Sequence, residues 1–215
     1  MNIQLIIFDF DGTIADTRQT IVLAKQETMK TMGLLVASDE VCASTIGLSS
    51  KRSFKVLYPE LSDAEVDLCV STYRRIFDEK KETAPPQIFP GVIETLERLK
   101  ERKITTTIAT SRNNVSLHEF LEKMNIIDYF PYVLGGDDTA FLKPNPEPVN
   151  KTLQDLSYTA EHTLVIGDMS FDIEMGNQAG TYTCGVTYGN STRSQLWEAG
   201  ADFVIDHMID LMDIL

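Results

Sequence analysis

Two aspartates near the start of the chain, Asp9 and Asp11, have the spacing of a paired carboxylate site. They follow the apolar run 5–8, which is typical of a strand buried on both faces. In an extended chain, residues two positions apart point to the same side. Two carboxylates facing one spot repel each other, and a bound cation resolves the repulsion; oxygen ligands favour Mg²⁺. A solvated acidic turn is the alternative interpretation, and the pair alone does not exclude it.

Other predicted strands of the chain also end in polar groups. In an open α/β sheet, ligands bind beyond the carboxyl ends of the strands, so groups at these positions are candidates for one site. Each group has an alternative role as a helix cap or a solvated charge, but together they predict a shared site. The groups are Thr110 and Ser111 after the run 104–109, Lys143 before the rigid loop 144–146, Asp168 after the run 164–166, and Asp172 one helical turn later.

Gly12 and Thr13 directly follow the aspartate pair. A glycine at this position lets the backbone turn and approach a ligand closely. At the next strand end, the hydroxyl groups of Thr110 and Ser111 can donate hydrogen bonds to an anion. We therefore expect these residues to contact the substrate.

The order of the predicted elements indicates the fold. After Pro85-Pro86, helical and strand-like segments alternate to the end of the chain, which is typical of βαβ units and a parallel sheet. An all-helical stretch separates the first strand from the rest. We predict an α/β fold with a Rossmann-like three-layer core and a parallel sheet, formed by residues 1–14 and 87–215. An all-helical cap domain, residues 15–86, is inserted into this core.

Helix start and stop signals support the helical interpretation of the inserted stretch. Asp16 is expected to cap its first helix, and Gly33 to end that helix. Ser62 and Glu65 form a possible capping box for a later helix. The segment therefore contains several helices and no predicted strand.

Composition restricts the partners and the compartment. The net charge of −13 would repel nucleic acids and anionic membranes. Cys42, Cys69 and Cys184 form no CxxC pair, which predicts reduced thiols in a cytoplasmic protein. The start, 1–7, lacks the basic segment of a signal peptide, and no apolar run approaches the ~20 residues of a membrane span. An anionic substrate must then be bound locally, by a metal ion, backbone amides and a few cationic side chains.

The motifs named above resemble the four motifs of the haloacid dehalogenase superfamily, in the same order. The resemblance extends over nearly the whole chain, and the helical insertion is similar to the small helical cap of that family. The stretches 143–148 and 185–189 resemble those of phosphoglycolate phosphatase-type members. The matching motifs are Asp9-Phe10-Asp11-Gly12-Thr13, Thr110, Lys143 with Pro144, and Gly167-Asp168 with Asp172.

This resemblance implies a Mg²⁺-dependent phosphatase that hydrolyses a small phosphate monoester through an aspartyl-phosphate. Asp9 would attack phosphorus, and Asp11 would protonate the leaving oxygen and then activate water. The Asp9 carboxylate, the Asp11 backbone carbonyl and the Asp168 carboxylate would hold Mg²⁺. Asp172 would orient the metal site or Lys143.

The same resemblance assigns the phosphate contacts and the role of the cap. Lys143 would supply a fixed positive charge, while Thr110 and backbone amides near Gly12 and Ser111 would donate hydrogen bonds to the phosphoryl group. Closing the cap would exclude water from the acyl phosphate.

Within the predicted cap, the loop and helix start at 47–52 are expected to face the core. Lys51 or Arg52 would meet a carboxylate or second anion of the substrate, and a solvated helix face is the alternative. The expected partner is a small phosphorylated metabolite, with no nucleic acid or membrane, and the expected state is a monomer or weak homodimer.

Several other functions remain open at this stage. The resemblance implies that a phosphosugar mutase of this superfamily would have a histidine in the helix after the first motif. The segment 17–25 has none, which disfavours a mutase. Inorganic pyrophosphatase and nucleotidase activities on the same fold remain alternatives. In a different class, a non-enzymatic phospho-receiver domain would also use an aspartate, a lysine and a hydroxyl around Mg²⁺. Asp11 argues against that class, because a placed acid and base shortens the life of an acyl phosphate.

Overall fold

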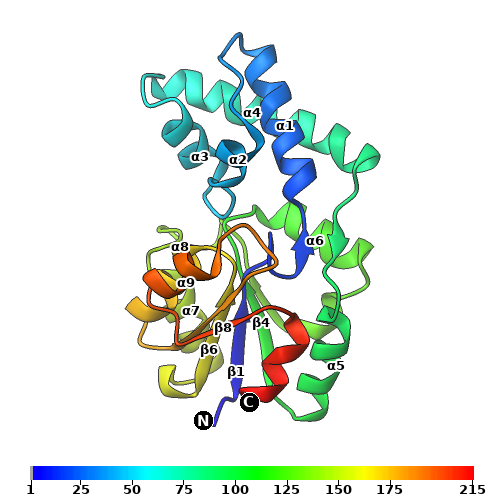
Figure 1. The fold of residues 1–215 in the computed structure, drawn as a ribbon, viewed down its shortest axis with the longest axis vertical. Coiled ribbons are helices and arrows are strands. Elements are labelled where there is room, and N and C mark those ends of the chain that lie inside the picture. The colour runs from blue at the N-terminus through cyan, green and yellow to red at the C-terminus, as the bar shows by residue number, and fades with distance from the viewer. Residues whose placement is uncertain (1) are drawn as a thin grey trace.

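The computed structural model describes residues 2–215 and contains a sheet with helices on both faces and a separate group of helices beyond one edge (Figure 1). Met1, the first residue of the expected core, lies outside the described residues. Within residues 2–215, no helix is both long and apolar enough to cross a membrane.

The core contains a six-stranded parallel sheet, as predicted. The first strand, β1, lies between β4 and β6, and all four of its residues are buried. In order across the sheet, the strands are β5 (Tyr132–Leu134), β4 (Thr105–Ala109), β1 (Leu5–Phe8), β6 (Thr163–Gly167), β7 (Tyr182–Val186) and β8 (Phe203–Ile205).

Alternate side chains of β1 pack into different hydrophobic clusters, because successive residues of a strand point to opposite faces. Ile6 and Phe8 belong to a cluster with residues of α5 (Val92–Glu101) and α6 (Asn114–Lys123). Leu5 and Ile7 belong to a cluster with residues of α7 (Glu147–Leu156) and α8 (Ser170–Gln178). The predicted three-layer α/β core is therefore confirmed.

Shorter helical elements complete the core. The helix α9 (Arg193–Glu198) precedes β8, and two single 3₁₀ turns lie at Ile127–Tyr129 and Ala160–His162. The expected terminal helix is a 3₁₀ helix, Met208–Asp213, and its residues Met208 and Leu211 are buried in the core.

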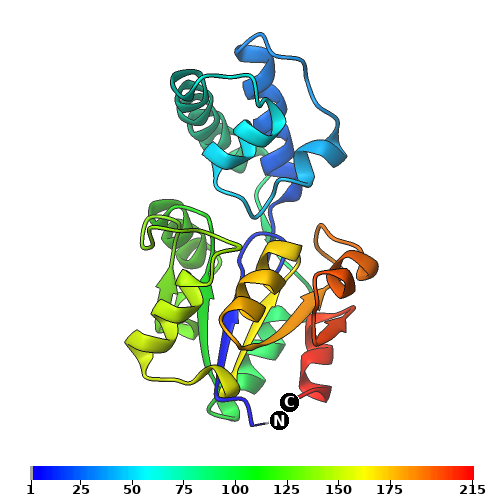
Figure 2. The ribbon, with the colours of Figure 1, turned by 90° about the vertical axis from the view of Figure 1, so that its left-hand side faces the viewer.

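The inserted stretch is helical, as predicted, and lies beyond the sheet edge where β1 ends (Figures 1 and 2). We call its four helices the cap. Ser38 caps the second helix, and Ser62 and Glu65 form the predicted capping box of the fourth. The cap helices are α1 (Arg18–Thr31), α2 (Asp39–Ala43), α3 (Ser50–Leu57) and α4 (Asp63–Thr83).

Two short strands, β2 (Ala15–Asp16) and β3 (Gln87–Ile88), connect the cap to the core and pair antiparallel. The helix α1 begins one position later than predicted, with Thr17 at the cap position, but the Thr17 side chain makes no capping hydrogen bond. Asp16 pairs with Gln87 of β3, and its side chain accepts a hydrogen bond from the Arg18 amide at 3.3 Å, as expected for a residue that caps the helix start. Gly33 follows the end of α1 with a φ of +68°, a conformation that favours glycine.

Candidate active site

The register of the sheet brings three predicted strand ends together. Phe8 pairs with Ile108 on one side and Ile166 on the other, so the strands β1, β4 and β6 end at the same level. Asp9, Thr110 and Asp168 therefore share one edge of the sheet, which faces the cap (Figure 1). This is the edge at which open α/β sheets bind their ligands.

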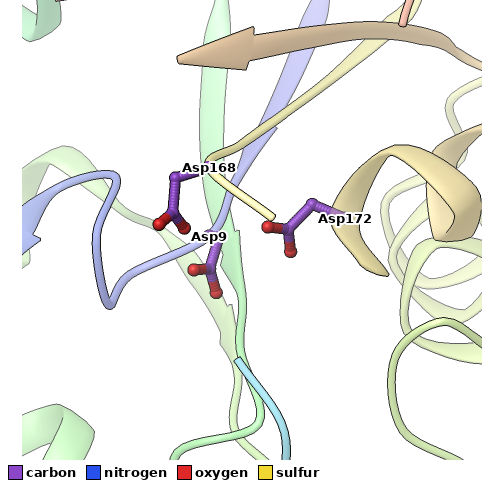
Figure 3. A group of neighbouring side chains, drawn as sticks. All are labelled: Asp9, Asp168 and Asp172. Atoms are coloured by element: carbon purple, nitrogen blue, oxygen red, sulfur yellow. The ribbon is translucent and has the colours of Figure 1, made fainter. Parts of the chain in front are cut away.

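Three carboxylates converge at this edge. Asp9 follows β1, Asp168 follows β6, and Asp172 lies in the first turn of α8; their side chains point toward a common centre (Figure 3). One carboxylate oxygen of each lies within 4.8 Å of those of the other two. All three are buried, with Asp9 2% exposed and Asp168 fully buried. Burial of so much like charge requires nearby positive charge.

Lys143 supplies part of that charge. Its Nζ donates to Asp9 Oδ1 and, at 2.6 Å, to Asp172 Oδ1. Burial disfavours the ammonium, but Asp172 and Asp9 outweigh this effect and raise the pKa of Lys143. Burial raises the pKa of Asp9 to about 7 against the opposing effect of Lys143. Burial and the neighbouring Asp172 and Asp9 also raise the pKa of Asp168.

The remaining carboxylate oxygens fit a divalent cation. Within residues 2–215, Asp9 Oδ2 and Asp168 Oδ1 are buried and have no hydrogen-bond partner. A buried anionic oxygen without a partner is costly, and Mg²⁺ takes oxygen ligands of this kind. Both oxygens of Asp172 already accept hydrogen bonds, from Lys143 and from the Met169 amide at 3.0 Å. The geometry thus favours Asp9 and Asp168 as metal ligands and Asp172 as the residue that orients Lys143.

Two neighbours of Asp168 fix its position. Asn190, which the sequence analysis missed, donates to Asp168 Oδ2 from its backbone amide at 2.7 Å and its side chain at 2.8 Å. Gly12 has a φ of +92°, and a Cβ there would lie 2.3 Å from Asp168 Oδ2. A glycine is therefore required for this close approach. The Gly12 amide itself donates to the Ala15 carbonyl at 2.8 Å.

The predicted hydroxyl residues lie close to this centre. Within the described residues, the buried hydroxyl groups of Thr13 and Ser111 have no hydrogen-bond partner. The Thr110 hydroxyl accepts from the Arg112 amide at 3.3 Å, and the Thr13 carbonyl accepts from the Tyr188 hydroxyl at 2.9 Å. Ser111 is thus free to donate to a ligand.

The sequence analysis also missed Arg112, which contacts both carboxylate oxygens of Asp11. It donates to Asp11 Oδ2 from Nε at 3.0 Å and to Asp11 Oδ1 from Nη2 at 2.5 Å. Its guanidinium group lies 5.0 Å from the ring centre of Phe77 in the cap and 4.9 Å from that of Phe120 in the core. The only available signal was its position directly after Thr110 and Ser111; nothing in the local sequence points to Asp11.

A cavity of about 770 Å³ lies between the cap and this edge of the core. Its size is within the usual range for small-molecule sites. Core residues of its lining include Asp11, Thr110 and Arg112, and cap residues include Lys25 and the segment 47–51. Asp9 and Asp168 lie outside this lining, so Asp11 is the carboxylate of the predicted pair that faces the cavity.

The two cap residues proposed for substrate binding lie in different places. Lys51 lines the cavity, but its Nζ is 2.7 Å from Asp67 Oδ1. Arg52 lies outside the cavity, and its Nη1 donates to the Lys143 carbonyl at 3.1 Å. Arg52 therefore connects α3 directly to the segment that carries Lys143.

Comparison with known proteins reveals one family. The haloacid dehalogenase-like hydrolase model matches residues 6–186. The chain is 35% identical over 204 residues to the probable phosphatase IndB of Dickeya dadantii, covering 94% of this chain and 89% of that protein. It is 31% identical to the pyrophosphatase PpaX of Anoxybacillus flavithermus, covering 100% and 98%.

Further similar proteins share the fold but carry names of different activities. The chain is 29% identical to the phosphoglycolate phosphatase of Vibrio parahaemolyticus, covering 100% of this chain and 96% of that protein. A crystal structure of a haloacid dehalogenase-like protein from Bacteroides fragilis superposes with a TM-score of 0.88 at 27% identity, covering 97% and 99%. These similarities extend over the cap as well as the core.

Proposed function

Because the chain belongs to the haloacid dehalogenase-like hydrolase family, we propose that it is a Mg²⁺-dependent phosphatase of small phosphate monoesters that works through an aspartyl-phosphate on Asp9. The observation that carries this proposal is the state of the Asp9 carboxylate. Lys143 orients the carboxylate through Oδ1, which we assign as the attacking oxygen, while Oδ2 is buried without a hydrogen-bond partner among the described residues and is left for the metal ion. A nucleophilic carboxylate needs an oriented position beside the phosphoryl group.

In the first step, an oxygen of Asp9 attacks phosphorus and the bond to the leaving oxygen breaks. Lys143 holds the Asp9 carboxylate in place and favours its ionised form against the effect of burial on its pKa. When bound, Mg²⁺ supplies positive charge that neutralises the phosphoryl oxygens, and Asp9, Asp168 and the Asp11 backbone carbonyl would hold it. Ser111 and Thr110 donate hydrogen bonds to the same oxygens, and Gly12 and Thr13 shape the turn beside them.

Asp11 carries the proton transfers in both steps. It protonates the leaving oxygen, and it then takes a proton from the water that attacks the acyl phosphate. Arg112 holds Asp11 at the cavity through both carboxylate oxygens. The first step requires a proton on Asp11, so one of these two contacts must open when the leaving group arrives.

Phosphoglycolate-like esters are the proposed substrates, and inorganic pyrophosphate is the alternative. One similar protein is named a phosphoglycolate phosphatase, at 29% identity, and another is named a pyrophosphatase, at 31% identity. A non-enzymatic phospho-receiver is disfavoured because Asp11 faces a cavity large enough for a substrate. Lys51 and Arg52 remain proposed cap contacts for the substrate. We further propose that the protein is a monomer or weak homodimer and that it is cytoplasmic. Its three buried free cysteines agree with a cytoplasmic location.

A phosphatase screen tests this proposal. Purified protein with Mg²⁺ should release phosphate from p-nitrophenyl phosphate, phosphoglycolate or pyrophosphate, and from few sugar phosphates or nucleoside monophosphates. Asp9→Asn keeps the size of the side chain and removes its nucleophilic charge, so it should abolish turnover in a folded protein. Asp128→Asn, at an exposed position, is the matched control. Residual activity of Asp9→Asn within tenfold of wild type would contradict the role of Asp9.

A further inference from the structure

A buried lysine of the cap, Lys25 on α1, takes no part in the mechanism above. Only 4% of it is exposed, and its Nζ donates to the Cys42 carbonyl at 3.0 Å and the Thr45 hydroxyl at 2.6 Å. Thr45 in turn accepts from the buried Ser53 hydroxyl at 2.8 Å and donates to the Cys42 carbonyl at 2.9 Å. Within residues 2–215, every hydrogen-bond partner of this cation is therefore a neutral oxygen.

This polar group lines the cavity that Asp11 and Thr110 also line. Lys25, Thr45 and Ser53 all belong to the cap side of the lining. Lys25 and the proposed acid and base, Asp11, thus face the same cavity from opposite sides. A ligand that reaches Asp11 in this cavity therefore lies in the field of Lys25.

The other cations of the lining differ from Lys25. Lys51, Lys81 and Arg112 each form an ion pair with a carboxylate, and Arg74 is exposed to solvent. An exposed cation is solvated, and a paired one is already neutralised. In the described part of the chain, Lys25 is thus the buried cation of this cavity that lacks a carboxylate in contact.

Burial of an unpaired ammonium is unfavourable. It lowers the pKa of Lys25 to about 7, and the Cys42 thiol and Asp11 oppose the shift only in part. An ammonium group has three N–H donors, and two of them are used here. The Cys42 carbonyl, in the last turn of α2, offers a partial negative charge that a purely structural lysine could neutralise. An anionic ligand would compensate the buried charge far better.

We propose that Lys25, with Thr45 and Ser53, forms a subsite in the cap that binds a second anionic group, a carboxylate or a phosphate, on the leaving-group side of the substrate. This inference rests on the proposed function and narrows it to esters that carry two anionic groups. The transferring phosphoryl group meets Lys143 and Mg²⁺ in the core, and the second anion meets Lys25 in the cap. Recognition of both groups would bring the substrate into contact with both parts of the protein.

A matched pair of substrates tests the subsite. Phosphoglycolate and 2-hydroxyethyl phosphate have the same length, but only the first carries a carboxylate. Wild type should prefer phosphoglycolate. The Lys25→Met variant should have a KM for phosphoglycolate about 10- to 100-fold above that of wild type, which is the loss of affinity expected when one charge-assisted hydrogen bond is removed. The KM for 2-hydroxyethyl phosphate should stay within about threefold of wild type. Pyrophosphate, in a parallel series, distinguishes a phosphate subsite from a carboxylate subsite.

Two controls separate recognition from stability. Lys30→Met removes an exposed lysine from the same helix and should change neither KM. If Lys25→Met does not fold, Thr45→Val replaces it, because this change removes a partner of Nζ and should reduce the preference in the same direction. A purely structural role of Lys25 would lower stability and leave the ratio of the two KM values unchanged.

The outcomes distinguish this inference from the proposed function. If wild type hydrolyses 2-hydroxyethyl phosphate but prefers neither phosphoglycolate nor pyrophosphate, the subsite is wrong and the phosphatase proposal stands. An equal effect of Lys25→Met on both matched substrates would likewise overturn the subsite. If no ester is hydrolysed with Mg²⁺, the proposed function itself fails.

Discussion

Arg112 contacts both carboxylate oxygens of Asp11, at 3.0 Å and 2.5 Å, in a pocket formed by aromatic rings from the cap and the core. The planar guanidinium group matches a carboxylate in a way that a lysine cannot. Its third contact, from Nη1 to the Ser116 hydroxyl at 2.7 Å, fixes the guanidinium group on α6. The position of Asp11 thus depends on packing between Phe77 in α4 and Phe120 in α6.

We predict that Arg112→Lys lowers kcat by at least about tenfold, because the single ammonium cannot hold both oxygens of Asp11 and a misplaced acid and base is inefficient. Steady-state kinetics with p-nitrophenyl phosphate and with an ester of a poor leaving group measure the effect. The loss should be larger for the poor leaving group, which needs protonation. Arg98→Lys, at an exposed arginine paired with Glu94, is the control. Equal kcat values for Arg112→Lys and wild type would show that the pair does not position Asp11.

A second prediction concerns the metal. Asp168→Asn should weaken Mg²⁺ binding strongly, and Asn190→Ala should weaken it about 10- to 100-fold, because Asn190 orients Asp168 through two hydrogen bonds. Isothermal titration with Mg²⁺ measures both changes, and Asp128→Asn serves as the control. Unchanged Mg²⁺ affinity in Asp168→Asn would rule out its role as a ligand.

The pKa of Lys25 leads to a prediction about stability and pH. The pKa is about 7 in the folded protein and 10.5 in an unfolded reference, so the unfolded state binds more protons between these values. The contribution of Lys25 to stability is therefore present above pH 10.5 and is lost as the pH falls through 7. Between pH 6 and 9, wild type should gain stability relative to Lys25→Met, which lacks the titrating group.

Urea unfolding of both variants across this pH range measures the difference. The charged groups that act on Lys25 are Asp11 and the Cys42 thiol, whose own pKa is raised by burial. Comparison of two variants that share these groups removes most of their effect. A constant difference in the free energy of unfolding would contradict the lowered pKa of Lys25.

We predict that residues 15–86 move as a unit against residues 1–14 and 87–215. Within residues 2–215, the chain passes between cap and core only at the paired strands β2 and β3. Across the remaining interface, Arg52 donates to the Lys143 carbonyl, and two ion pairs, Lys81–Glu119 and Lys123–Glu82, join α4 to α6. Small-angle X-ray scattering with Mg²⁺, with and without a phosphate analogue such as vanadate, should show a more compact molecule in the presence of the analogue. Identical scattering profiles at saturating vanadate would argue against cap closure.

Local sequence patterns were sufficient to predict much of the fold and of the site. The run 5–8, the hydroxyl pair at 110–111 and Asp168 each lie at a strand end, and parallel strands end at one edge of a sheet. The alternation of elements after Pro85-Pro86 likewise predicts the parallel sheet. These features depend on neighbours in sequence, so they are visible without a structure.

The features that the sequence analysis missed depend on contacts between distant segments. Arg112 and Asp11 are 101 positions apart, and Asn190 and Asp168 are 22 apart. Lys25 is indistinguishable in the sequence from a solvated lysine on a helix, and only the packing of α2 and the loop at Thr45 buries it. The start of α1 was predicted one position early, because the pairing of Asp16 with Gln87 is also a long-range contact.

The central claim, an acyl phosphate on Asp9 that Asp11 helps to hydrolyse, is tested most directly by rapid-quench kinetics of Asp11→Asn. Nitrophenolate is a good leaving group, so phosphorylation of Asp9 should still occur, whereas hydrolysis should slow by about 10²–10⁴-fold. At saturating Mg²⁺, we predict a burst of nitrophenol near one equivalent per active site, followed by a slow phase. No burst together with steady turnover at the wild-type rate would show that Asp11 is neither the acid nor the base, and would contradict the mechanism.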